Sequence, residues 1–257
     1  MLTQAIDARG IATLTLNRPD KHNALDRQTI ADLHRSLLAL NTRNDIRAIV
    51  LTGAGPSFCA GADLEHMRSM LHASEEENQR DARALANCLR QLNEMECPVL
   101  AKVNGNTFGG GVGLIACADI AIAADTSQFA LSEVRLGLVP ATISPYVTAA
   151  VGSRQARRWF LTGEMFDANT AQAIGLIHVL STPDKLDEAL ARQADLILRA
   201  GPIAVREAKK LVRHVQGNFD LDSLVESTSD LLARLRVSSE GQEGVTAFLE
   251  RRKPSWQ

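Results

Sequence analysis

One carboxylate of this 257-residue chain stands out as a candidate for proton transfer. Glu133 lies in residues 132–140, SEVRLGLVP, among the apolar residues Phe129, Leu131 and Leu136. Desolvation by apolar neighbours raises the pKa of a carboxyl group, which suits it to move protons near neutral pH. Taken alone, Glu133 is more simply interpreted as an exposed glutamate at a helix start, or as the partner of Arg135.

Two segments rich in small residues could offer backbone N–H groups to a ligand. Residues 58–64 read FCAGADL, with a helix predicted to begin near Asp63, and residues 104–113 read NGNTFGGGVG at the start of another helix. Unpaired N–H groups and the positive end of the helix dipole at such starts suit an anion or a developing oxyanion. A tight turn and a close helix–sheet crossing are the simpler interpretations of each segment alone.

The glycines also suggest a dinucleotide-binding fingerprint. Gly111, Gly113 and Ala116 fit the pattern G-x-G-x-x-[G/A], and Glu133 stands near the place of its ribose-binding acid. That fingerprint directly follows its strand, whereas the strand predicted here ends before Asn104. We therefore disfavour a Rossmann site.

Composition and charge limit the possible partners. The chain is 45% hydrophobic and carries a formal net charge of -2, which is ordinary for a globular protein and argues against a nucleic-acid surface. Its cysteines, Cys59, Cys88, Cys97 and Cys117, form no C-x-x-C pair, and its histidines form no ligand-like cluster, so we expect no metal site. The absence of a leader pattern and of a long apolar run predicts a cytoplasmic protein without a membrane partner.

Strand-like and helix-like stretches alternate through most of the chain. We predict strands over residues 11–17, 46–52, 99–103 and 119–123, and helices over 26–43, with Asp26 as N-cap, and 80–95. This alternation implies β-α-β crossovers and mainly parallel pairing, which is an α/β fold.

The end of the chain is predicted to be entirely helical. The four predicted helices cover residues 184–199, 203–214, 221–235 and 240–251, and the pairs Gly201-Pro202 and Gly217-Asn218 separate the first three. A tail of about 60 residues is short for an independent core. We expect it to pack onto the main body or onto another subunit.

Seven segments in order resemble the crotonase, or enoyl-CoA hydratase/isomerase, superfamily. They are NRPDKHNAL (17–25), SFCAGADL (57–64), NGNTFGGGVGL (104–114), CADIAIA (117–123), QFALSEVRLGLVP (128–140), AIGLIHVL (173–180) and FLERRKPSW (248–256). The resemblance implies a spiral of β-β-α turns over residues 1–195 and a helical trimerisation region over 196–257. It also implies homotrimers, often paired into hexamers.

The resemblance further implies where an acyl-coenzyme A thioester binds. Ala62 and Gly110 match the two positions whose backbone N–H groups form the family's oxyanion hole. Coenzyme A is part of this substrate, so we expect no separate cofactor. Its coenzyme A portion would contact positions on three segments. They are Lys21, His22, Ala24, Ala60, Asp63, Leu64 and Lys253, the last commonly reaching the site of a neighbouring subunit.

One departure from the family pattern bears on the reaction. Two-acid hydratases carry a first glutamate where this chain has Gly113, so that only the second acid, Glu133, remains. Glu133 would then both activate water and protonate Cα. The alternatives are an enoyl-CoA isomerase that moves one proton with a single glutamate, another enolate chemistry on the same scaffold, and a catalytically silent acyl-CoA-binding protein.

A finer resemblance concerns the acyl group. Residues 132–147 and 153–168 resemble the bacterial hydratases of branched, carboxylated enoyl-CoAs, those of leucine degradation (3-methylglutaconyl-CoA) and of acyclic terpene breakdown. The sequence PATISPY, residues 140–146, replaces the glycine-rich PGAGGTQ of generic hydratases. We therefore expect Gly113, Arg135 and Pro140 to shape the acyl pocket, with Arg135 able to pair with a distal carboxylate.

Overall fold

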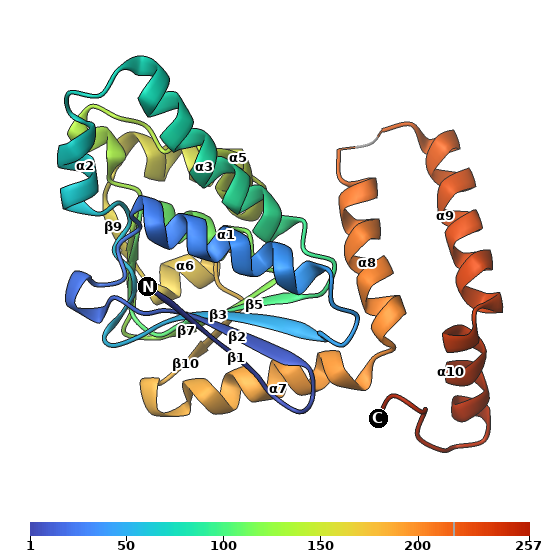
Figure 1. Cartoon of the computed structure of the whole chain (residues 1–257). Helices are drawn as coiled ribbons and strands as arrows, with labels where there is room; N and C mark the ends of the chain where they lie inside the picture. The colour runs from blue at the N-terminus through green and yellow to red at the C-terminus, as the bar shows by residue number, and fades with distance from the viewer. Residues whose placement is uncertain (218) are drawn as a thin grey trace.

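Two β-sheets organise the chain in a computed structural model that describes residues 1–217 and 219–257 (Figure 1). The larger, six-stranded sheet has the order β1-β2-β3-β5-β7-β10, and the smaller, four-stranded sheet has the order β4-β6-β8-β9. The strands of the larger sheet are Leu2–Ile6, Ile11–Leu16, Ala48–Gly53, Val99–Val103, Ile120–Ala124 and Val179–Ser181. Those of the smaller sheet are Ser57–Cys59, Asn106–Phe108, Gln128–Ala130 and Met165–Asp167.

The chain passes repeatedly from the larger sheet to the smaller sheet and then into a helix. β3 leads into β4, β5 into β6 and β7 into β8, and each pair is followed by helical structure. All neighbours in both sheets are parallel except β1 with β2 and β8 with β9. This succession is the expected spiral of β-β-α turns, and the predicted α/β class is confirmed.

Alternation along the strands sends side chains to two separate apolar layers. In β3, Ile49 and Leu51 join the core beneath the long helices, whereas Ala48 and Val50 face a second cluster on the opposite side. Successive strand residues point to opposite faces, so a continuous run of buried residues marks a sheet covered on both sides.

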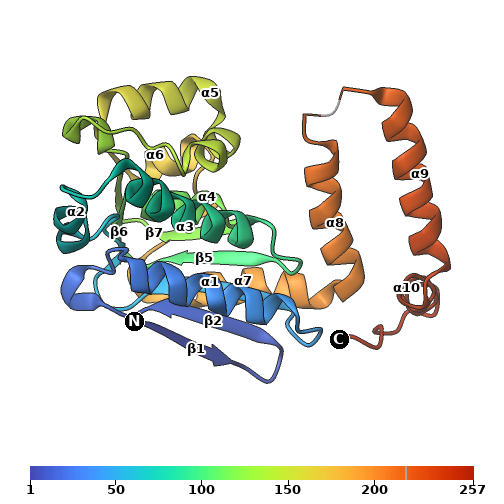
Figure 2. The ribbon, with the colours of Figure 1, turned by 45° about the horizontal axis from the view of Figure 1, so that its top comes forward.

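The helices α1 (Arg27–Asn41) and α3 (Glu75–Asn93) cover one face of the larger sheet (Figure 2). The predicted N-cap Asp26 accepts a hydrogen bond from Thr29 N at 2.7 Å. The predicted helix over 80–95 begins earlier than expected, because Ser74 and Glu77 form a capping box.

Further helices follow the strands of the smaller sheet. They are α2 (Leu64–Met70), α4 (Gly110–Ala116), α5 (Ser144–Thr162), α6 (Ala168–Ala173) and the 3-10 helix η2 (Glu133–Leu136). The four short strands of the smaller sheet and the helices α5 and α6 lie beyond the sequence predictions.

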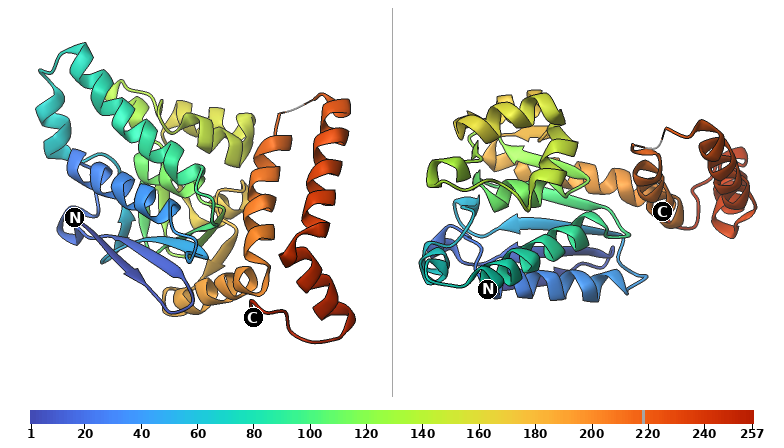
Figure 3. Two further views of the ribbon diagram at one scale, coloured as in Figure 1. Left: turned by 45° about the vertical axis from the view of Figure 1, so that its right-hand side comes forward. Right: turned by 90° about the horizontal axis from the view of Figure 1, so that it is seen from above.

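The C-terminal helices are α7 (Leu186–Arg199), α8 (Pro202–Val215), α9 (Leu221–Val237) and α10 (Ser239–Leu249). They match the four predicted helices; Asn218, part of an expected break, lies outside the described residues. α7 packs on the second face of the larger sheet, so the expected boundary at residue 195 falls within a helix of the body. The helices α8, α9 and α10 form an arm to one side (Figure 3).

Two further features bear on the sequence predictions. All four cysteines are buried and unpaired with one another. Over the described part of the chain, no helix is both long and apolar enough to cross a membrane.

Candidate active site

Glu133 begins η2, directly after the smaller sheet, where its side chain is held against a neighbouring turn. Its Oε1 would lie 2.9 Å from a Cβ built on Gly109, so the carboxyl group rests over the backbone just before α4. Oε2 is buried and has no hydrogen-bond partner among the described residues. Burial raises the pKa of Glu133, as expected for a carboxylate removed from water without a compensating cation.

Glu133 lines a cavity of about 380 Å³. The predicted site residues Ala60, Ala62, Leu64, Gly110 and Pro140 line it as well. Most of the remaining wall is apolar and comes from α2, α3 and the segment before α5. Such a cavity, apolar with a few convergent polar groups, suits a small organic ligand.

The backbone of Ala62 is oriented by a short parallel bridge with Leu25. Leu25 N donates to Gly61 O at 2.7 Å, and Asp63 N donates to Leu25 O at 3.0 Å. Leu25 therefore forms hydrogen bonds with the carbonyl of Gly61 and the N–H of Asp63, the residues on either side of Ala62. The N–H of Ala62 consequently points to the opposite side of the segment, away from Leu25. The amide of Gly110 is the first of α4, where no intrahelical acceptor exists.

Two glycines allow these segments to approach one another. Gly61 has φ +86° and a Cβ there would lie 2.9 Å from Phe108 O, while Gly109 has φ +48° and lies under Glu133. Both the left-handed backbone and the lack of space require glycine. The amides of Ala62 and Gly110 and the carboxyl group of Glu133 are thereby gathered at one cavity.

A second cavity of about 370 Å³ adjoins the first through Ala60, Ala62 and Leu64, which line both. The expected coenzyme A positions Lys21, His22, Ala24 and Asp63 line this second cavity. Lys21 pairs with Glu65 at 3.1 Å, and His22 Nδ1 lies 3.0 Å from Ser57 Oγ. Six of the seven predicted coenzyme A positions therefore surround one space.

Lys253 lies elsewhere. It is exposed in the C-terminal segment, whose end lies beside the arm, while α2 lies at the opposite end of the molecule (Figure 1). Within a single chain Lys253 is remote from both cavities, as the expectation of a contribution to a neighbouring subunit requires.

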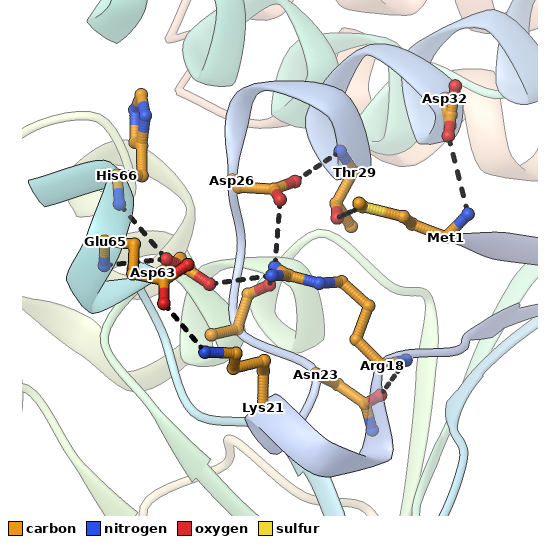
Figure 4. Close-up of polar contacts among 11 residues, drawn as sticks. Met1, Arg18, Lys21, Asn23, Asp26, Thr29, Asp32, Asp63, Glu65 and His66 are labelled. Carbon is orange, nitrogen blue, oxygen red and sulfur yellow. Dashed lines mark hydrogen bonds and ion pairs between the residues drawn. The ribbon is translucent and has the colours of Figure 1, made fainter. Parts of the chain in front are cut away.

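Arg18 links the chain around Ala24 and Asp26 to Asp63, between the two cavities. The sequence did not single it out. Its guanidinium lies 3.1 Å from Asp26, 2.9 Å from Asp63 and 2.9 Å from Ala24 O (Figure 4). Asp63 also caps α2 by accepting from the N–H groups of Glu65 and His66. The Asp63 carboxylate is therefore fully occupied by contacts within the protein. Asp63 lines the second cavity because of its place in the loop, and its carboxylate is not directed at a ligand.

Two of the residues expected in the acyl pocket do not line the cavity. Gly113 is buried in α4, and a Cβ there would overlap Ile143 Cγ2 and lie 2.7 Å from Ile143 Cβ. Ile143 itself lines the cavity, so Gly113 acts through the space that it leaves for Ile143. Arg135 is exposed and lies beside Gly163, because the tight turn of η2 directs it away from Glu133.

A further polar pair on the cavity wall was missed. His66 Nε2 lies 2.9 Å from Asp81 Oδ2, and both residues line the first cavity. Fifteen residues separate them in the sequence, so only the packing of α2 against α3 reveals the pair.

Comparisons with known proteins agree with this geometry. Residues 7–257 match the family described as "Enoyl-CoA hydratase/isomerase". The chain belongs to this family. The match covers both cavities and the C-terminal helices.

Individual family members resemble the chain over nearly its full length. A crystal structure of an enoyl-CoA hydratase from Shewanella pealeana superposes with a TM-score of 0.94 at 41% identity, covering 99% of this chain and 95% of that one. Crotonyl-CoA hydratase of Syntrophomonas wolfei is 33% identical, over 96% of this chain and 94% of that protein. The 2,3-dehydroadipyl-CoA hydratase of Escherichia coli is 31% identical, over 96% and 94%.

Proposed function

We propose that this enoyl-CoA hydratase/isomerase family member adds water reversibly to a 2-enoyl-CoA thioester. One observation carries the proposal. Glu133, whose buried Oε2 has no hydrogen-bond partner in the described part of the chain, meets the amides of Ala62 and Gly110 at one mainly apolar cavity. The crotonyl-CoA and dehydroadipyl-CoA hydratases among its relatives support the same reaction.

In this proposal the thioester oxygen accepts hydrogen bonds from the N–H groups of Ala62 and Gly110. Glu133, as carboxylate, takes a proton from a water molecule whose oxygen bonds to Cβ. The electron pair of the double bond moves to the thioester oxygen as an enolate, and the amides stabilise the negative charge. Glu133 then returns the proton to Cα, which completes the addition with no net change in the enzyme.

The single-acid mechanism suits the surroundings of Glu133. The side of the cavity nearest Gly113, where a two-acid hydratase carries its first glutamate, is occupied by Ile143. A raised pKa lets one carboxyl group serve as base and then as acid near neutral pH.

The two adjoining cavities suit the two ends of an acyl-coenzyme A. The acyl group would occupy the cavity at Glu133, and the coenzyme A portion the one at Lys21, His22 and Ala24. We propose a short, branched acyl group resembling 3-methylglutaconyl-CoA, enclosed by Pro140 and Ile143.

We also propose that the chain acts as a homotrimer or a dimer of trimers in which Lys253 serves a neighbouring site. The helices of the arm support this. α9 has no buried residue, and apolar side chains along the arm remain exposed in the single chain, among them Leu221 (73%), Val225 (66%) and Phe248 (81%).

The test is to incubate the protein with crotonyl-CoA and with 3-methylglutaconyl-CoA and to follow the thioester masses. We expect the mass of one water to be gained, with the branched substrate preferred. Unchanged masses on both substrates would refute hydration. Migration of the double bond in a 3-enoyl-CoA would then identify an isomerase, and calorimetric binding without turnover a silent binder.

A further inference from the structure

The wall of the acyl cavity formed by α2 and α3 carries a histidine–aspartate pair that the proposed mechanism does not use. His66 Nε2 and Asp81 Oδ2 lie 2.9 Å apart, and their side chains are only 15% and 22% exposed. Both residues line the cavity that holds Glu133. A polar pair on a largely apolar wall is a feature that orients ligands in small-molecule sites.

Asp81 fixes the imidazole from one side. Its second oxygen, Oδ1, lies 3.6 Å from Arg27 Nε, so the carboxylate is shared between Arg27 and His66. The backbone N–H of His66 points to Asp63, while its ring turns away from the Arg18 contacts (Figure 4). With Nε2 held by Asp81, Nδ1 has no partner among the described residues, and it is the ring nitrogen left for a ligand.

His66 and Ala62 lie on the wall of the same cavity. Ala62, whose amide would bind the thioester oxygen, precedes the N-cap Asp63 of α2, and His66 lies in the first turn of that helix. The neighbouring wall residues Met67, Leu85 and Leu138 are apolar. The His66 ring is therefore placed to meet a polar group remote from the thioester.

Hydrogen bonding favours an acceptor at this place. A carboxylate at Nδ1 would complete a chain in which Nε2–H donates to Asp81 and Nδ1–H donates to the ligand, while Arg27, 3.6 Å from Asp81 Oδ1, offsets the charge of Asp81. The Glu133 carboxyl group lines the same cavity from η2. Arg135, the cation first expected to bind a distal carboxylate, lies outside the cavity.

We propose that His66, oriented by Asp81, is a specificity-determining residue that binds a carboxylate at the distal end of the acyl group. The inference rests on the proposed function in that it takes this cavity as the acyl site. The pair would select acyl-CoA thioesters that carry a second, distal acid over those that end in a methyl group.

Calorimetry with two unreactive thioesters, glutaryl-CoA and butyryl-CoA, separates recognition from turnover. We expect the wild-type protein to bind glutaryl-CoA roughly 10- to 100-fold more tightly, the range of one hydrogen bond to a charged group. His66→Leu should abolish this preference without weakening butyryl-CoA binding. His66→Gln, which keeps a donor, should retain part of it, and Arg135→Met, the matched control, should retain all of it.

The outcomes are distinguishable. Equal binding of the two thioesters by the wild type, or a preference that survives in His66→Leu, would overturn the role of His66. If crotonyl-CoA is still hydrated, the proposed function stands regardless. Loss of the preference in Arg135→Met would assign the carboxylate to that residue and overturn the inference. Failure of both thioesters to bind would contradict the proposed function as well.

Discussion

Replacing Gly113 by alanine tests whether Ile143 sets the shape of the catalytic cavity. The added Cβ would overlap Ile143 Cγ2 and lie 2.7 Å from Ile143 Cβ. Ile143 is buried where α5 begins and lines the cavity, so the new methyl group must push apart α4 and the start of α5, whether or not Ile143 also rotates. This displacement alters the shape of the cavity.

Two effects of opposite sign determine how much Gly113→Ala changes the free energy of unfolding. Alanine favours a helix over glycine by about 1 kcal/mol. Overpacking a closely packed core costs about 1–3 kcal/mol. Because the close contact at position 113 involves the Cβ of Ile143, a change of rotamer alone does not relieve it, and we place the cost in the upper part of that range. The expected result is a net loss of about 1–2 kcal/mol.

Urea unfolding at one fixed protein concentration measures this loss, with Ile143→Ala and the double variant completing the cycle. Ile143→Ala removes the Cγ2 that the new methyl group meets. The double variant should therefore lose about 1 kcal/mol less than the sum of the single losses. A Gly113→Ala variant as stable as the wild type, with additive energies in the cycle, would refute the steric argument.

Three further predictions concern the ionisable groups. Because burial raises the pKa of Glu133, the folded chain binds the Glu133 proton more tightly than the unfolded chain, and this stabilisation is lost as pH rises above about 4. The melting temperature of Glu133→Gln, relative to that of the wild type, should therefore increase from acidic to neutral pH. A difference in melting temperature that stays constant with pH would contradict this. Arg18→Met leaves Asp26 and Asp63 without their cation and should lower the free energy of unfolding by about 3 kcal/mol or more; a loss below about 1 kcal/mol in urea would show that the cluster is dispensable. Lys21→Met should raise KM for crotonyl-CoA roughly two- to fivefold at unchanged kcat, and an unchanged KM would show that Lys21 does not contact the coenzyme A portion.

The sequence predicts most of the long elements because they carry a strong periodic signal. The stripe on α1 and the continuous apolar run of β3 are examples, and both are buried as expected. The 19-residue α5 is the exception, and its helical pattern is interrupted at Gly152, which has a non-helical backbone. The short strands β4 and β6 escaped because three residues carry too little pattern. Their existence depends on pairing between distant segments.

The candidate site was predictable where function depends on the backbone. The small residues predicted the turns that lead into α2 and α4, and the family resemblance singled out Ala62 and Gly110 within them. Where function depends on side chains that meet across the fold, the sequence was insufficient. The sequence does not show that Arg135 lies beside Gly163 instead of in the cavity, nor that His66 of α2 meets Asp81 of α3.

The central claim, that Glu133 alone moves the protons of hydration, is tested most directly by the crotonyl-CoA hydration rate of Glu133→Gln. We expect a loss of roughly 100- to 10,000-fold, with butyryl-CoA binding within about twofold of wild type, since glutamine preserves the shape and removes the base. Glu226→Gln, an exposed position on α9, is the control and should be fully active. A near-normal rate in Glu133→Gln would contradict the account.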